Sequence, residues 1–190
     1  MRDKVYFASD LHLGAPDYAK SRQREDKFVS WLSEIEDTAQ EIYILGDVFD
    51  FWFEYKHVVP KGFLRLFAKL LDLRSKGIPI TIIRGNHDLW MFDYIEQELD
   101  IPVYDQVIER EFGGKQFLIG HGDGLGPGDS LFKVLRRIFM NNACRKVFSW
   151  IHPDLGLGFA SKWSKRSRAN HKEEEEEFLG KDKEWLVQYS

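Results

Sequence analysis

Residues 41–52 read EIYILGDVFDFW, and this stretch decides the fold that we expect of the whole chain. The apolar run Ile42–Leu45 has the pattern of a strand buried on both faces, which is typical of a parallel sheet. Gly46 ends the run, and Asp47 follows at the carboxyl end of the strand, the edge where open α/β sheets bind ligands. A buried carboxylate requires a partner or a metal ion, because an isolated buried charge is costly. For this motif taken alone, a turn aspartate after a strand is the alternative.

Three further strand patterns end in polar clusters of the same kind. Amphipathic helices are expected between them at Ala19–Ile35, Phe63–Leu73 and, shorter, Leu89–Leu99. This alternation predicts a largely parallel sheet, in which the loops at the carboxyl ends of the strands lie on one edge. The strands and their clusters are Lys4–Ser9 with Asp10 and His12, Ile78–Ile83 with Gly85–Asp88, and a hairpin of Val107–Phe112 and Gln116–Ile119 with His121 and Asp123.

The composition limits the class of protein. A chain of 190 residues suffices for one domain with a sizeable core, and its net charge of −4 gives no sign of a nucleic-acid binder. Cys144 is the single cysteine, which excludes an internal disulfide and fits a reducing compartment. The sequence enters a strand pattern almost at once, and no apolar run approaches the roughly 18 residues that span a bilayer. We therefore expect a cytoplasmic protein.

The residue types in the four clusters indicate a metal site. Carboxylate oxygens and imidazole nitrogens suit Mn, Fe or Zn, and two ions sharing one carboxylate lie about 3.5–4 Å apart, which suits phosphoryl chemistry. Asp10 and His12 would point to one side of an extended backbone, and His87 could reach a substrate without being a ligand. Asn86 as a turn residue and 120–128 as a flexible loop are the alternatives for single motifs. The candidates are Asp10, His12, Asp47, Asn86, His87, Asp88, His121 and Asp123.

Four of these motifs together resemble the calcineurin-like metallophosphoesterases: SDLHLG at 9–14, GDVFDFW at 46–52, GNHD at 85–88 and GHGD at 120–123. The resemblance implies a four-layer α/β/β/α sandwich and two divalent metals, with Mn the first choice. It implies that Asp10 and His12 bind one metal, that Asn86 and His121 bind the other, and that Asp47 bridges them. It also makes His87 and Asp88 the catalytic residues, with His87 protonating the leaving group or steadying the phosphate.

Within that superfamily the chain looks most like the UDP-2,3-diacylglucosamine pyrophosphatases of lipid A biosynthesis. The similar features are the aromatic residues at 49, 51 and 52, the HGD loop, and an inserted basic segment that carries SRAN at 167–170. The resemblance implies cleavage of UDP-2,3-diacylglucosamine to UMP and 2,3-diacylglucosamine 1-phosphate by a peripheral enzyme on the inner face of the inner membrane. It implies substrate contacts from Asn86, His87, Asp129 and Arg168.

Two departures from the family pattern bear on these expectations. His87 stands where the best-known pyrophosphatases have Arg, and no Gly-His-x-His motif supplies the last ligand of each metal. His152 and His171 do not match that motif. We therefore expect one metallophosphoesterase domain over 1–190, with a helical cap insertion at about 129–170 and the C-terminal part of the family domain beyond Ser190. The alternative is a protein that binds one metal weakly, or none.

The charge is unevenly distributed along the chain. Residues 131–168 contain nine basic residues and one acid, Asp154, mixed with many apolar side chains. This composition is typical of membrane interfaces and favours a cap that takes acyl chains and touches an anionic membrane surface. An ordinary helical subdomain packed on the sheet is the alternative. Single-stranded nucleic acid is disfavoured, because the aromatic residues are mixed with aliphatic ones.

Three functions therefore compete. The first is the di-metal pyrophosphatase acting on a UDP-linked diacylated glucosamine. The second is a soluble phosphoesterase of the same superfamily that acts on a nucleotide or a phosphoprotein, although such an enzyme does not need the basic, apolar segment. The third is a non-catalytic scaffold, which the missing histidine pair favours and the intact Asp, His and Asn set argues against.

Overall fold

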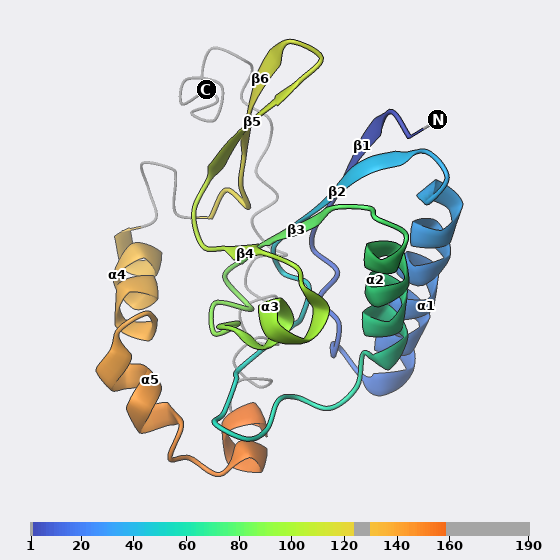
Figure 1. Ribbon diagram of the computed structural model, residues 1–190. Helices are drawn as coiled ribbons and strands as arrows, with labels where there is room; N and C mark the ends of the chain where they lie inside the picture. Colours follow the sequence, from blue (N-terminus) through green and yellow to red (C-terminus); the bar gives the residue numbers. More distant parts are fainter. Residues whose placement is uncertain (1, 124–129, 159–190) are drawn as a thin grey trace, which may run out of the picture.

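The computed structural model describes residues 2–123 and 130–158, and its centre is a parallel sheet of four strands (Figure 1). The strands are β1 (Lys4–Ala8), β2 (Ala39–Leu45), β3 (Ile80–Ile83) and β4 (Val103–Tyr104), in the order β1-β2-β3-β4. β3 is buried throughout, as expected of a central strand covered on both faces. The predicted parallel sheet is confirmed; β4 was not predicted, because two residues carry no periodicity.

Two helices, α1 (Tyr18–Ile35) and α2 (Leu64–Ser75), lie side by side and cover one face of this sheet (Figure 1). Their apolar stripes meet the sheet in the main core, where Leu32 and Leu66 are fully buried. The buried carboxylate of Glu25 accepts hydrogen bonds from the N–H groups of Arg65 and Leu66, each at 3.1 Å. A side chain of α1 thus satisfies unpaired donors at the start of α2, which fixes how the two helices pack.

A hairpin of β5 (Ile108–Phe112) and β6 (Lys115–Ile119) packs on the opposite face of the parallel sheet through Ile119, Tyr43 and Ile83. Gly113 and Gly114 form its turn with φ of 59° and 75°, the left-handed conformation that tight hairpins require. The layers are therefore helices, parallel sheet and second sheet. β6 thus delivers His121 from a second, antiparallel sheet, which confirms the predicted hairpin and the two-sheet sandwich that the family resemblance implies. Only the inference that strand–helix alternation puts all four loops on one parallel sheet is wrong.

Helix α3 (Tyr94–Leu99) begins five residues later than predicted. Leu89 and Trp90 instead join a cluster of aromatic side chains in the loops beyond β2 and β3. The carboxylate of Glu54 accepts hydrogen bonds from the N–H groups of Asp93 and Tyr94, at 2.9 and 3.2 Å. This distant carboxylate, rather than a local capping residue, sets where α3 starts.

Helices α4 (Ser130–Phe139) and α5 (Asn142–Phe148) lie on the side of the view opposite α1 and α2, and the chain then turns back to helical residues at 153–158 (Figure 1). The indole N–H of Trp90 donates to the carbonyl oxygen of Phe139 at 2.7 Å, and Phe148 packs into the same aromatic cluster. The part of the predicted cap that the structure describes is thus helical and is attached to the loops at the site. Among the described helices, none is long and apolar enough to cross a bilayer.

Candidate active site

The loops that follow β1 and β2 are joined by backbone hydrogen bonds. The N–H groups of Asp10 and His12 donate to the carbonyl oxygens of Gly46 and Asp47, at 3.2 and 2.8 Å. Asp10, His12 and Asp47 have φ of 58°, 41° and 51°, so the expectation of an extended Asp10-x-His12 backbone is wrong. Such conformations cost roughly 1–3 kcal/mol each and persist where the surrounding structure enforces them, as these paired loops do.

Asp47 lies between two histidines that come from different sheets. Its Oδ2 atom is 3.5 Å from Nε2 of His12 and 3.6 Å from Nε2 of His121. Its Oδ1 atom accepts a hydrogen bond from the backbone N–H of His87 at 3.0 Å. With Oδ1 held in this way, Oδ2 is the oxygen that faces both imidazoles.

These distances fit a metal centre better than direct hydrogen bonds, which are shorter than about 3.2 Å. Two atoms bound to one ion at about 2.0–2.2 Å, with bond angles of about 90–110°, lie about 2.8–3.6 Å apart. Ligand atoms lie within 4.8 Å of one another in each of two sets, Asp10 with Asp47 and His121, and His12 with Asp47 and His87. Asp47 belongs to both sets, so the residues fit a pair of divalent ions that share its carboxylate.

Two glycines allow the loops to approach this closely. A Cβ atom on Gly85 would lie 2.2 Å from Oδ1 of Asp47, and one on Gly46 would lie 2.6 Å from Nδ1 of His121. Gly46 also has φ of 80°, in the left-handed region. The glycines in the GD and GNHD motifs therefore make room for the side chains of the cluster.

The charges of the cluster influence one another strongly. Burial and the nearby Asp88 carboxylate raise the pKa of Asp47 to about 6, although His87 and His121 favour its charged form. Burial by itself lowers the pKa of His121, but the Asp47 carboxylate and the Leu45 carbonyl outweigh it, so that this pKa is raised overall. Shifted pKa values of this kind are typical of functional sites.

A backbone carbonyl orients His121. Its Nδ1 donates to the carbonyl oxygen of Leu45 at 2.7 Å, which directs Nε2 toward Asp47 and toward Oδ1 of Asn86, 3.3 Å away. A ring N–H fixed on a backbone carbonyl is the usual support of a metal-binding imidazole. Asn86 and His121 are thereby brought together from β3 and β6.

His87 is oriented by Asp50, a residue that the sequence did not single out. Nδ1 of His87 lies 2.9 Å from the carbonyl oxygen of Asp50, and its ring lies edge-to-face on His12 with centroids 4.7 Å apart. Oδ1 of the buried Asp50 side chain is 3.9 Å from Nδ1 of both His12 and His87. The signal for Asp50 was the second aspartate of GDVFD, three residues after Asp47.

Asp88 is fully buried and does not open to the cluster. Its carboxylate accepts hydrogen bonds from the N–H groups of Val48 and Gly85, at 2.8 and 2.7 Å, and burial raises its pKa. It thereby ties the loop after β2 to the loop after β3. With these contacts Asp88 positions the two loops, and the catalytic role that the family resemblance implies for it stays a prediction.

The structure thus gathers six of the predicted residues into one cluster: Asp10, His12, Asp47, Asn86, His87 and His121. Asp129 and Arg168, the predicted substrate contacts, lie outside the described residues.

Known proteins resemble this chain along most of its length. A UDP-2,3-diacylglucosamine hydrolase of Porphyromonas gingivalis is 34% identical over 201 residues, covering 100% of this chain and 77% of that protein. Proteins of the same name from Haemophilus ducreyi and Yersinia pestis are each 26% identical, covering 96% and 95% of this chain and 76% and 78% of theirs. The match to a solved structure, a protein of unknown function from Aquifex aeolicus, covers 71% of this chain and 70% of that one, with 18% identity and a TM-score of 0.41.

The family model of the calcineurin-like phosphoesterases matches residues 3–182. This match covers every motif of the cluster and both sheets. The chain therefore belongs to the calcineurin-like phosphoesterase family of metal-dependent hydrolases.

Proposed function

We propose that the protein hydrolyses the pyrophosphate bond of UDP-2,3-diacylglucosamine to UMP and 2,3-diacylglucosamine 1-phosphate in lipid A biosynthesis. Support for the substrate comes from relatives named UDP-2,3-diacylglucosamine hydrolase, one of them 34% identical over the whole chain. The observation that carries the reaction class is the position of Asp47 Oδ2, 3.5 and 3.6 Å from two histidine nitrogens. A shared carboxylate of this kind suits two metals acting on one phosphoryl group.

In this proposal Asp10 and His12 hold one divalent ion, Asn86 and His121 hold the other, and Asp47 bridges both. Mn is the metal that we propose first, with Fe or Zn as alternatives for the same oxygen and nitrogen ligands. When bound, the ions supply an activated water and neutralise charge on the phosphoryl group. His87 lies close to His12 and Asp47 and is the alternative ligand; loss of metal in His87→Ala would identify it as one.

His87 is the residue that we propose to act on the departing phosphate. Its Nδ1 donates to the Asp50 carbonyl oxygen, so the opposite ring nitrogen is the one that can give a proton to, or hydrogen-bond, an oxygen of the substrate. The buried Asp50 carboxylate lies 3.9 Å from the same nitrogen. Asp50 and Asp88 serve as positioning residues.

We propose that helices α4 and α5 belong to a cap over about 129–170, which takes the acyl chains and touches the anionic cytoplasmic face of the inner membrane. In and just after α5, Val147 and Trp150 are 60% and 76% accessible, and the neighbouring cation Lys146 is exposed as well. An apolar surface flanked by cations is suited to an anionic lipid interface. Substrate contacts from Asp129 and Arg168 are part of the same proposal.

A substrate panel tests this function. The Mn²⁺-loaded protein is incubated with UDP-2,3-diacylglucosamine, UDP-N-acetylglucosamine, nucleoside monophosphates and a phosphopeptide, and the products are identified by mass spectrometry. UMP and 2,3-diacylglucosamine 1-phosphate should form from the acylated substrate far faster than products from the others. Faster turnover of a nucleotide or the phosphopeptide would favour the soluble phosphoesterase, and no turnover of any substrate would favour the scaffold.

A further inference from the structure

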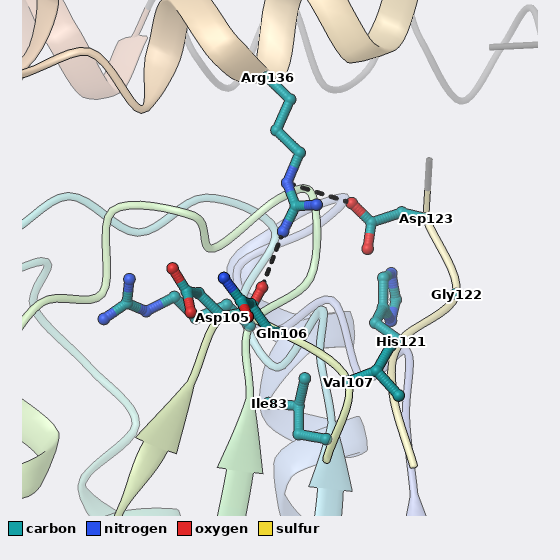
Figure 2. A pocket seen from close by; sticks show the side chains of 9 residues that line it. Ile83, Asp105, Gln106, Val107, His121, Gly122, Asp123 and Arg136 are labelled. Atoms are coloured by element: carbon teal, nitrogen blue, oxygen red, sulfur yellow. Dashed lines mark hydrogen bonds and ion pairs between the residues drawn. The ribbon is translucent and has the colours of Figure 1, made fainter. Parts of the chain in front are cut away.

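A cavity of about 300 Å³ opens beside His121, between the loops that follow β3, β4 and β6 and the helix α4 (Figure 2). Its volume lies at the lower end of the roughly 300–1,000 Å³ that small-molecule sites occupy. Most of its lining is polar: Arg84, Gln106, His121, Asp123 and Arg136 contribute, together with Val107. Because His121 belongs to the metal cluster, a ligand in this cavity would have one end at the reacting centre.

Two buried groups at the cavity have unused hydrogen-bonding capacity. Oδ2 of Asp123 accepts no hydrogen bond from the described residues; its contact is an ion pair with Nε of Arg136 at 3.8 Å (Figure 2). Nε of Arg84 likewise donates to none of the described residues. Buried polar atoms are normally hydrogen-bonded, so the cavity offers one acceptor and one donor that a ligand would satisfy.

The cations near the cavity also indicate an anionic ligand. Arg136 reaches in from α4 and donates to the backbone carbonyl oxygen of Asp105 at 3.1 Å (Figure 2). Arg84 and Arg145 both contact Phe92, one through its carbonyl oxygen and one over its ring, and burial and the charge of Arg84 lower the pKa of Arg145. A phosphate bound by Arg84 would offset its repulsion of Arg145.

We propose that this cavity binds the nucleoside monophosphate half of the substrate, an inference that rests on the proposed function and adds to it. The Asp123 carboxylate accepts hydrogen bonds from the ribose hydroxyls, as acidic residues do in other nucleotide sites. Arg84 and Arg136 bind the phosphate, and Val107 packs on the nucleoside. The polar lining excludes acyl chains, which lie instead along the apolar surfaces of α4 and α5.

Calorimetric titration of the full, Mn²⁺-loaded chain tests this assignment. UMP should bind at least about tenfold more tightly than orthophosphate, and 2′-deoxy-UMP should bind more weakly than UMP. Arg136→Gln and Asp123→Asn should each weaken UMP binding about tenfold or more, the usual effect of losing a charged hydrogen bond. Asp123→Asn should also reduce the preference for UMP over its 2′-deoxy form. Metal content and melting temperature are measured for every variant.

Arg137→Gln is the matched control, because Arg137 is an exposed neighbour on the same helix and does not line the cavity. The assignment is overturned if Arg136→Gln binds UMP as Arg137→Gln does, or if the wild type binds orthophosphate as tightly as UMP. A protein that shows the expected UMP pattern but does not hydrolyse UDP-2,3-diacylglucosamine would overturn the proposed function and leave the cavity assigned. Hydrolysis of UDP-2,3-diacylglucosamine without the expected pattern of UMP binding would support the proposed function and overturn the assignment of the cavity.

Discussion

The substitution Asp47→Asn is expected to change stability in opposite directions with and without metal. In metal-free protein, burial and the Asp88 charge raise the pKa of Asp47 to about 6, from 3.8 for an unperturbed side chain. The pKa of Asp47 is higher in the folded than in the unfolded protein. Its contribution to the free energy of unfolding is therefore complete below about pH 4 and is lost as the pH rises through about 6. A shift of about two units corresponds to about 3 kcal/mol, the most that Asn can restore at pH 7.5.

Urea denaturation in the presence of a chelator measures this effect at pH 5 and at pH 7.5. The free energy of unfolding of the Asn variant should exceed that of the wild type by up to about 3 kcal/mol at pH 7.5. The difference should be smaller at pH 5, where most of the wild-type carboxyl is already protonated in the folded protein. Asp37→Asn, at an exposed position, is the control and should change stability by less than about 0.5 kcal/mol.

Saturating Mn²⁺ should reverse the order of the two proteins. Each ion at 100 times its dissociation constant stabilises the protein that binds it by about 2.7 kcal/mol, so two ions stabilise the wild type by about 5.4 kcal/mol, more than the roughly 3 kcal/mol that Asn restores. The Asn variant lacks the bridging charge that holds the ions. A metal-free Asn variant that is less stable than the wild type at pH 7.5 would refute the reasoning, because Asp47 would then be stabilising without metal.

Three further predictions concern rate, packing and substrate. His87→Ala should keep the metals and lose roughly 10²–10⁴-fold in kcat, measured together with metal content; metal loss would instead make His87 a ligand. Gly85→Ala should destabilise the fold by roughly 1–3 kcal/mol in thermal melts and weaken metal binding, because its Cβ would lie 2.2 Å from Oδ1 of Asp47. Removing the acyl groups of the substrate should lower kcat/KM far more than changing the nucleotide base, since each buried methylene contributes up to about 0.8 kcal/mol; equal efficiencies would leave α4 and α5 without a role in binding lipid.

The sequence predicted the elements whose signals are local. The continuous apolar run at 42–45 identified β2, and the stripe of α1 and the glycine pair of the hairpin were equally clear. The start of α3 was misplaced because Glu54, 40 residues before Tyr94, provides its N-terminal hydrogen bonds. Contacts of that kind leave no periodic trace in the sequence.

The candidate site shows the same division between chemistry and geometry. Residue types and motif order predicted which side chains would gather, but the reasoning from an extended backbone failed at Asp10 and His12, because backbone bonds to the β2 loop hold both in left-handed conformations. The contacts of Asp50 with the two histidines and the full burial of Asp88 were not predicted. These depend on the packed structure rather than on spacing.

Electron paramagnetic resonance of the Mn²⁺-loaded protein tests the central claim most directly. Two ions that share the Asp47 carboxylate would lie about 3.5–4 Å apart, close enough for their spins to couple. We predict the spectrum of a coupled pair in the wild type and its loss in Asp47→Ala, together with loss of UMP release from UDP-2,3-diacylglucosamine. A wild-type spectrum of isolated Mn²⁺, or a coupled pair that persists in Asp47→Ala, would contradict the account.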